Sequence, residues 1–391
     1  MEKIKITIDG KLCEGFAGNT VLGIARNNGI DIPSLCYNGR VKVYGACGVC
    51  VVEAEGMPKL LRSCATVATD GAVYHTDTER VKQARKIAFE LIMSDHEGDC
   101  LPPCMLDCPA NTNCQAYIKQ IALGDAKEAT RIVKETNPLP ASIGRVCPHP
   151  CEKACRRQYV EEPLSIAFLK YFAADKDLFS GDKYVPEVAA STGKKVGIIG
   201  GGPAGLTAAY FLRLKGHDVS VYDMMPNMGG MLRYGIPEYR LPKDGILQKE
   251  IDSIEELGVK MINNYKIGRD SSFEDFRKSF DATVIAVGAW TSSKIGCPGE
   301  DIPGVYGGID FLRGVILDDA PEIGKNVAIV GGGNTAMDAC RTAVRLGAEN
   351  VYVIYRRTEA EMPAEQIEID EAREEGVQFK FLTNPAEIIA G

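Results

Sequence analysis

The chain of 391 residues is 45% hydrophobic and carries 45 Lys and Arg against 53 Asp and Glu, a formal net charge of −8 at pH 7. This composition is typical of a folded protein with two or three domains, and its acidic balance argues against nucleic acid as a partner. No apolar run approaches the roughly 20 residues of a membrane span and the N-terminal segment lacks the apolar core of a signal peptide, so we expect a cytoplasmic protein.

Cysteine is unevenly distributed along the chain. Twelve of the 14 cysteines lie between Cys13 and Cys155, and only Cys297 and Cys340 follow. In a reducing compartment, closely spaced cysteines indicate metal or redox clusters far more often than disulfides. Cys13, Cys297 and Cys340 stand outside the spaced groups and are interpreted as small apolar packing residues.

The first domain is expected over residues 1–78. Residues 3–8 alternate between apolar and polar side chains, which predicts a half-buried strand, and Asp9-Gly10 favours a hairpin turn into a second strand. A short capped helix should end at Gly29, before a loop that contains Cys36. Helix-forming residues at helical spacing begin at about residue 79, where the next domain starts.

Four cysteines of this domain have metal-ligand spacing: Cys36, Cys47, Cys50 and Cys64. Four thiolates suit a [2Fe-2S] cluster or tetrahedral zinc, and the single C-x2-C pair favours the cluster because structural zinc usually takes two such pairs. The spacing and the preceding hairpin resemble the [2Fe-2S] domain of the large iron–sulfur subunit of respiratory complex I and of NAD-linked hydrogenases. The resemblance implies a β-grasp ferredoxin fold.

A small helical domain is expected over residues 79–175. It carries seven further cysteines, which nearly supply the eight ligands of two [4Fe-4S] clusters: Cys100, Cys104, Cys108, Cys114, Cys147, Cys151 and Cys155. This region resembles the N-terminal domain of the glutamate synthase small subunit, which also occurs in dihydropyrimidine dehydrogenase and NADH-dependent ferredoxin:NADP oxidoreductase. The resemblance implies that Cys104 and Cys108 end the first cysteine group of the family and that the last three cysteines form the second.

The sequence departs from that family pattern at three points. An early family cysteine is absent, Cys114 is additional, and Lys170, whose ammonium group cannot ligate iron, stands near the position of a Gln or Glu ligand. Cys114 is a candidate replacement for that ligand, and His96, four residues before Cys100, is a candidate for the eighth ligand. A surface role for His96 and ligation by Asp95 or Asp99 are alternatives, and the assignment of each cysteine to a cluster stays open.

A polar stretch over residues 175–193 predicts a linker or a surface strap, after which the pattern strand, Gly-rich turn and helix occurs twice. The first occurrence predicts a dinucleotide-binding domain over residues 194–320. Its strand ends in Gly200-x-Gly202-x-x-Gly205, and the glycines let the helix N-terminus, with Pro203 and Ala204, approach a pyrophosphate. The next strand ends on Asp223, where an acid that binds ribose is expected.

Residues 228–243 closely resemble the flavin-side segment of the glutamate synthase small subunit family, which implies FAD as the first dinucleotide. The resemblance places Gly229 and Gly230 near the isoalloxazine ring and Gly288 on the strand that returns to the FAD domain. In this family a later Gly-Asp motif completes the FAD site, and this motif is not found before residue 391. We therefore expect an incomplete FAD domain, belonging to a longer protein or completed by a partner.

The second occurrence predicts a nicotinamide nucleotide domain over residues 321–391. Gly331-x-Gly333 precedes a helix that starts with Asn334 and Thr335, and the strand after this helix ends in Arg356-Arg357 rather than in an acid. Paired arginines suit a 2′-phosphate through charge-assisted hydrogen bonds, which favours NADP(H) over NAD(H). Ordinary surface ion pairs of the two arginines are the alternative.

Together these features predict a multidomain α/β protein with a [2Fe-2S] domain, a two-[4Fe-4S] domain and two Rossmann-like domains that bind FAD and NADP(H). The implied function is an electron-transfer subunit that works with a complex I-like flavoprotein, a hydrogenase or a formate dehydrogenase, as in electron-bifurcating transhydrogenases of anaerobes, with ferredoxin as a further candidate partner. A glutamate synthase small subunit and a non-catalytic iron–sulfur conduit are the alternatives. No Ser/His/Asp set or carboxylate pair stands out, so the chemistry is expected to be that of the cofactors.

Overall fold

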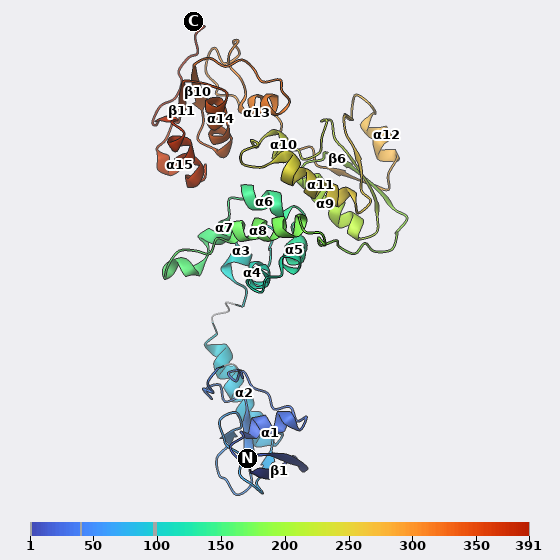
Figure 1. Cartoon of the computed structure of the whole chain (residues 1–391), viewed down its shortest axis with the longest axis vertical. Helices are drawn as coiled ribbons and strands as arrows, with labels where there is room; N and C mark the ends of the chain where they lie inside the picture. Colours follow the sequence, from blue (N-terminus) through green and yellow to red (C-terminus); the bar gives the residue numbers. More distant parts are fainter. Residues whose placement is uncertain (1, 40, 97–99, 391) are drawn as a thin grey trace. The chain divides into compact units, whose positions relative to one another are not determined.

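The computed structural model describes residues 2–39, 41–96 and 100–390 (Figure 1). The chain divides into two units, Met1–Cys100 and Leu101–Gly391, and each unit is described by itself. Among the described residues, no helix combines the length and the apolar character that a bilayer span requires.

The first unit is a small sheet with two helices. Its strands, in the order β2-β1-β5-β3-β4, are β1 (Lys3–Ile8), β2 (Lys11–Phe16), β3 (Val51–Ala54), β4 (Leu61–Arg62) and β5 (Val73–His75). Asp9 and Gly10 both have positive φ, as a two-residue hairpin turn requires, and β1 pairs antiparallel with β2 and parallel with β5. The helices are α1 (Val21–Asn27), capped by Thr20, and α2 (Glu79–Ser94), capped by Thr78. The predicted first strand and the helix beginning at residue 79 are therefore confirmed.

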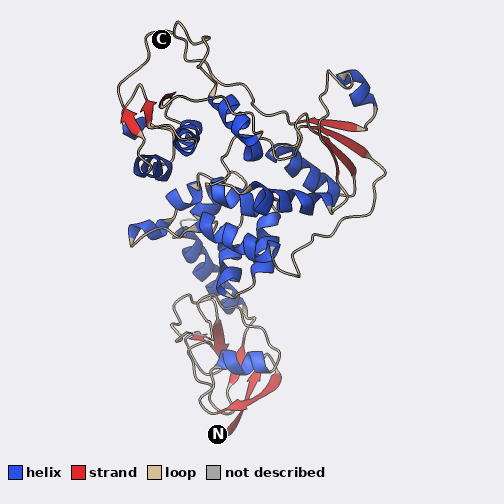
Figure 2. Ribbon diagram, turned by 45° about the horizontal axis from the view of Figure 1, so that its top comes forward, coloured by secondary structure: helices blue, strands red, loops and turns tan. Residues whose placement is uncertain are grey.

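The second unit begins with short helices, which Figure 2 shows in blue. They are α3 (Pro103–Leu106), α4 (Cys114–Ala122), α5 (Ala126–Lys134), α6 (Pro140–Val146), α7 (Pro150–Lys153), η1 (Arg156–Tyr159) and α8 (Ile166–Leu178). Helix α8 continues past residue 175, so the predicted start of the linker is wrong. The buried Asp177 accepts a hydrogen bond from the backbone N–H of Tyr184, and Asp175 forms an ion pair with Arg145, and both contacts hold the last turn of α8.

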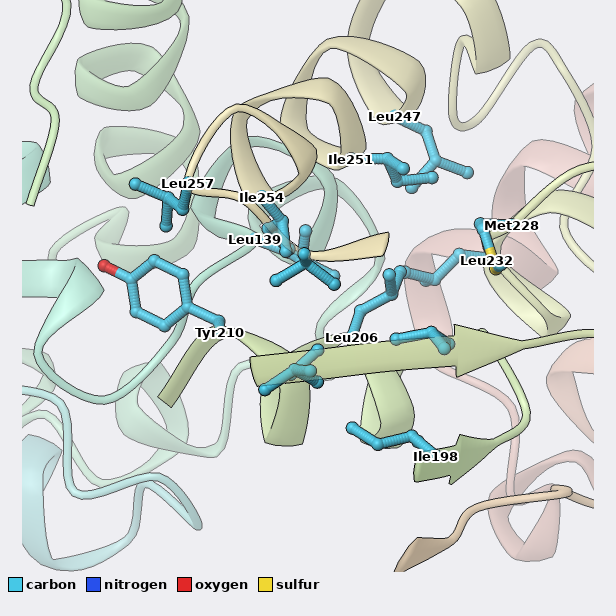
Figure 3. Close-up of a cluster of buried hydrophobic side chains, with 14 of the residues drawn as sticks. Leu139, Ile198, Leu206, Tyr210, Met228, Leu232, Leu247, Ile251, Ile254 and Leu257 are labelled. Atoms are coloured by element: carbon cyan, nitrogen blue, oxygen red, sulfur yellow. The ribbon is translucent and has the colours of Figure 1, made fainter. Parts of the chain in front are cut away.

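A four-stranded parallel sheet follows, with strand order β8-β7-β6-β9. Its elements are β6 (Lys195–Ile199), α9 (Pro203–Leu214), β7 (Asp218–Tyr222), α10 (Met231–Tyr234), the π-helical turn η2 (Lys243–Leu247), α11 (Gln248–Glu255), β8 (Lys260–Ile262), α12 (Phe273–Lys278) and β9 (Ala282–Ile285). Apolar side chains of β6, β7, α9 and α11 form one buried cluster, which also includes Leu139 at the start of α6 (Figure 3).

A second parallel sheet, β10-β11-β12, repeats the arrangement of strand, turn and helix. Its elements are α13 (Gly308–Ile316), β10 (Asn326–Val330), α14 (Asn334–Arg345), β11 (Asn350–Ile354), η3 (Glu359–Glu361), α15 (Gln366–Glu374) and β12 (Gln378–Lys380). Buried residues of α14, β11 and α15 form its core. Two Rossmann-like sheets are thus present, as predicted.

Candidate functional site

The four cysteines predicted to hold the [2Fe-2S] cluster lie in loops of the first unit. Cys36 and Cys47 lie between α1 and β3, Cys50 directly precedes β3, and Cys64 follows β4. The thiols interact as two pairs, Cys36 with Cys47 and Cys50 with Cys64, and Cys64 also lies within the electrostatic range of the other pair. These pairwise interactions are compatible with the predicted [2Fe-2S] cluster, and ligation by these four cysteines stays a prediction.

The protonation of these thiols depends on the loop backbone. Burial raises the pKa of Cys47, but hydrogen bonds from the backbone at Cys36, Val49 and Leu35 outweigh burial and bring this pKa down to about 7. Burial and the neighbouring Cys50 raise the pKa of Cys64 to about 12. The loop therefore stabilises negative charge on one sulfur, and a bound cation would be needed to deprotonate the whole set.

Several cysteines of the second unit gather around Cys114, the residue that the family pattern does not contain. Cys114 is 3% exposed at the start of α4, and its Sγ lies 3.7 Å from the carbonyl oxygen of Cys104. Its thiol also pairs with that of Cys151 on α7, and Cys108 and Cys155 contribute to the electrostatics of the group. The interaction with Cys151 and burial raise the pKa of Cys114, whereas this same interaction lowers the pKa of Cys151 to about 7.

The surroundings of this group fit a [4Fe-4S] cluster held by Cys114. The positive charge of Lys170 on α8 also helps to lower the pKa of Cys151, so Lys170 acts here as a nearby cation. Among the described residues, no three His, Cys, Asp or Glu side chains have the compact arrangement of a single-ion site. Ligation by Cys114 stays a prediction.

The remaining ligand candidates are separated between the two units. His96 Nε2 lies 3.1 Å from Cys100 Sγ, and both residues belong to the first unit. Asp95 caps the C-terminus of α2, and Asp99 lies outside the described residues. Cys147 directly follows α6 in the second unit, and its Sγ accepts a hydrogen bond from the backbone N–H of His149. The structure pairs His96 with Cys100, and their role as ligands stays a prediction.

The first Gly-rich turn is held by an internal hydrogen-bond network. Asp223 is 6% exposed, and its two carboxylate oxygens accept hydrogen bonds from the backbone N–H groups of Gly201 (2.6 Å) and Met225 (2.8 Å). A Cβ atom at Gly205 would lie 1.9 Å from the carbonyl oxygen of Gly200, so only glycine fits where α9 meets the strand. The predicted ribose ligand Asp223 therefore also fixes the shape of the turn.

The flavin-side segment lies directly against this turn. A Cβ atom at Gly230 would come within 2.6 Å of the Cα of Gly202, and the backbone N–H of Gly229 donates to the carbonyl oxygen of Gly201. Pro203 and Ala204 begin α9 at the same place. Gly288 follows β9, the strand that pairs with β6 and so brings the returning segment back to the sheet. Glycine at both Gly202 and Gly230 thus lets the two backbone segments lie in direct contact.

The second turn is less constrained. Gly333 caps α14, and the nearest atom to a Cβ placed on it is 3.9 Å away. Asn334 accepts a hydrogen bond from the backbone N–H of Glu365, while Thr335 follows it in the first turn of the helix. Arg356 and Arg357 are exposed just beyond β11, and neither guanidinium forms an ion pair with a described residue, which leaves both available to a phosphate.

A buried ion network joins the two nucleotide regions, and sequence reasoning missed it. Arg240, in the flavin-side segment, forms ion pairs with Asp338 on α14 (2.7 Å) and with Glu368 on α15 (2.5 Å). Its neighbour Tyr239 lies beneath the guanidinium of Arg345 and beside a cavity of about 460 Å³. The only sequence feature that could have pointed to this network is the presence of charged residues on the buried face of α14.

Three family models match the chain in succession. Residues 1–79 match the 2Fe-2S iron-sulfur cluster binding domain, residues 96–181 match the dihydropyrimidine dehydrogenase domain II, 4Fe-4S cluster, and residues 194–391 match the pyridine nucleotide-disulphide oxidoreductase model. The chain belongs to the pyridine nucleotide-disulphide oxidoreductase family. In this oxidoreductase, both iron–sulfur modules precede the nucleotide-binding part.

Curated relatives share most of this oxidoreductase chain. The NADP(+)-dependent formate dehydrogenase subunit beta of Moorella thermoacetica is 43% identical over 312 residues, which are 74% of this chain and 44% of that protein. The NADPH-Fe(3+) oxidoreductase subunit beta of Geobacter sulfurreducens is 43% identical over 73% of this chain and 43% of its own length. The Escherichia coli glutamate synthase (NADPH) small chain is 36% identical over 73% of this chain and 63% of its own length. The chain thus spans less than half of the first two relatives.

These matches confirm several sequence-based predictions. The family resemblance, the multidomain fold class, the oxidoreductase class and the cofactor types carried by the three modules are all confirmed. Two of these relatives are themselves named as β subunits. The exact domain boundaries and the individual site residues stay predictions.

Proposed function

We propose that this chain is the nucleotide-binding and iron–sulfur part of a multisubunit oxidoreductase that exchanges electrons with NADP(H). The observation that carries the proposal is the composition of one unit, residues 101–391, which contains a buried group of cysteines together with two dinucleotide turns. A conduit without catalysis would not need two such turns. The [2Fe-2S]-type domain adds a further group of thiols in the other unit.

FAD and NADP(H) would be held by different residues. Asp223 and the turns at Gly202 and Gly230 would hold FAD, and the turn at Gly333 with Arg356 and Arg357 would hold NADP(H). When bound, flavin exchanges electron pairs with the nicotinamide and single electrons with iron–sulfur clusters. The chain's own contribution is to orient the nucleotides, neutralise the 2′-phosphate and keep the thiolates in place.

The partner is proposed to be a complex I-like flavoprotein, a hydrogenase or a formate dehydrogenase subunit. Two observations support this class. The N-terminal module is the 2Fe-2S type, and one relative that is 43% identical is the β subunit of an NADP(+)-dependent formate dehydrogenase. The glutamate synthase small chains match at lower identity.

The test is an anaerobic reduction of the purified full-length protein. Iron and flavin content are measured first, and about ten iron atoms are expected for one [2Fe-2S] and two [4Fe-4S] clusters. NADPH or NADH is then added while flavin absorbance and low-temperature EPR spectra are recorded. Bleaching of the flavin by NADPH together with signals of both cluster types would support the proposal.

Two results would contradict it. An iron content near six would remove one [4Fe-4S] cluster from the proposal. Cluster signals that arise with dithionite but not with NADPH, in a protein that retains no flavin, would favour a passive conduit. Dithionite-reduced protein therefore serves as the control for cluster integrity.

A further inference from the structure

One buried carboxylate connects the cysteine-bearing helices to the FAD-side fold. Glu250 lies on α11 and is 2% exposed. One of its oxygens accepts the backbone N–H of Ala141 at 2.7 Å, and the other accepts the N–H of Ser142 at 2.8 Å. Both donors belong to the first turn of α6, 109 and 108 residues away in sequence. The carboxylate thus takes up two N–H groups that have no partner within their own helix.

Apolar side chains enclose this contact. Leu139 precedes α6, and Ile251 and Ile254 flank Glu250 on α11, and all three belong to the same buried cluster (Figure 3). Hydrogen bonds to a charged acceptor are strong in such surroundings, and loss of the acceptor would leave two buried donors unsatisfied. Burial is the largest influence and leaves the pKa of Glu250 raised, although its hydrogen bonds and the charge of the buried Lys134 on α5 act in the opposite direction. Both polar and apolar interactions therefore hold α6 against α11.

The two helices lead to different parts of the electron path. Helix α6 ends at Val146, Cys147 follows directly, and α7 carries Cys151 four residues later. Helix α11 continues from η2, which begins at the end of the flavin-side segment, residues 228–243. At the opposite end of α6, Arg145 forms two hydrogen bonds with Asp175 on α8, so α6 is held at both ends.

We propose that Glu250 is a positioning residue, which fixes the second cysteine group relative to the flavin-side segment and thereby sets the rate of electron transfer between the two. This inference rests on the proposed function. Each transfer takes one electron from the reduced flavin and adds it to an oxidised cluster, and no bond to Glu250 is made or broken. The same contact would hold the spacing of the two regions while the nucleotide is exchanged.

The decisive variant is Glu250→Gln in the full-length protein. The glutamine oxygen accepts one of the two N–H groups, but its NH2 group faces the other N–H as a second donor. Electron transfer from flavin to the clusters is monitored after rapid mixing of the protein with NADPH. We expect its rate to fall roughly tenfold or more, because small displacements of reacting groups have large effects on rate. The rate of flavin reduction by NADPH should stay unchanged.

A second readout does not depend on activity. Hydrogen–deuterium exchange of the backbone over residues 139–147 should become faster in Glu250→Gln, because the two N–H groups lose their shared acceptor. The matched control is Glu255→Gln, which removes an exposed carboxylate from the same helix and should change neither exchange nor transfer. If Glu250→Gln loses clusters, Glu250→Asp, which keeps the charge on a shorter side chain, is measured in the same way.

The outcomes separate the inference from the proposed function. Faster exchange over residues 139–147 with an unchanged transfer rate would overturn the positioning role, and so would unchanged exchange. Slower transfer with normal cluster content, normal flavin reduction and faster exchange would support it. If wild-type protein shows no transfer from flavin to clusters, the proposed function fails as well, and this failure is visible before any variant is compared.

Discussion

The two dinucleotide turns share one pattern but differ in how they are held. In the first turn, the third glycine is Gly205, and a Cβ atom there would lie 1.9 Å from the carbonyl oxygen of Gly200. In the second turn, the corresponding residue is Ala336, whose Cβ lies 3.7 Å from a Cβ placed on Gly331. The first turn therefore has no room for a Cβ atom at the position where the second turn holds an alanine, and the same motif tolerates different packing in the two regions.

The strand ends differ in charge as well as in bonding. Asp223, directly after β7, is buried and already bonded to the backbone, whereas Arg356 and Arg357 beyond β11 are exposed and without ion pairs to described residues. The first site is organised by contacts within the protein, and the second presents groups that a ligand has to satisfy. Substitutions should accordingly damage the fold in the first region and ligand binding in the second.

The largest effect is expected from Gly205→Ala. The new methyl group would overlap a backbone oxygen, so α9 has to move, and the free energy of unfolding should fall by about 3 kcal/mol or more. Urea unfolding and FAD content measure the loss. The matched reverse change, Ala336→Gly, should cost only about 1 kcal/mol through helix propensity. Equal losses in the two variants would show that the turns are packed alike.

Neutralising both arginines should affect binding rather than folding. Arg356→Gln combined with Arg357→Gln removes charge-assisted hydrogen bonds to a 2′-phosphate, so NADPH affinity should fall roughly 100-fold while NADH affinity changes less than about threefold. Isothermal titration with both nucleotides measures the ratio. Arg373→Gln, which removes an exposed arginine paired with Glu359 on the same domain, is the control. Parallel losses for NADPH and NADH would exclude the 2′-phosphate role.

A smaller effect is expected from Asp223→Asn. The amide oxygen can accept only one of the two backbone N–H groups, so the turn should lose about 1–2 kcal/mol of stability and FAD should bind several-fold more weakly. Thermal unfolding and flavin release report these changes. Asp218→Asn, at the partly exposed start of the same strand, is the control. A variant that keeps its stability but loses FAD would point to direct ribose contact rather than to support of the turn.

Local patterns predicted much of the fold. The strand at Lys3–Ile8 alternates strictly, and α9 and α14 begin directly after glycines of the two turns, so their positions follow from neighbouring residues. The spacing of Cys36, Cys47, Cys50 and Cys64 likewise predicted a set of thiols that the structure brings together.

The remaining features depend on contacts that no local pattern contains. Glu250 meets α6 across 109 residues and Arg240 meets Asp338 across 98, and in both cases a charge lies within an otherwise ordinary helical or loop sequence. The linker was predicted too early because polar residues at the end of α8 are held by partners elsewhere, such as Arg145 for Asp175. A sequence shows that a residue is charged, but the burial of that charge can be predicted only when its distant ion-pair or hydrogen-bond partner is also known.

The ion pairs of Arg240 also bear on how modules of this kind can be recombined. Its guanidinium bonds to both Asp338 and Glu368, which are 4% and 8% exposed and belong to separate helices of the nucleotide domain. A chimera that takes this domain from a homologue without matching acids would leave the guanidinium of Arg240 buried without an ion-pair partner. This would lower the stability of the fold by several kcal/mol. Designers who wish to swap nucleotide preference should therefore graft the loop beyond β11 alone, or transfer the segment around Tyr239 and Arg240 together with both acids.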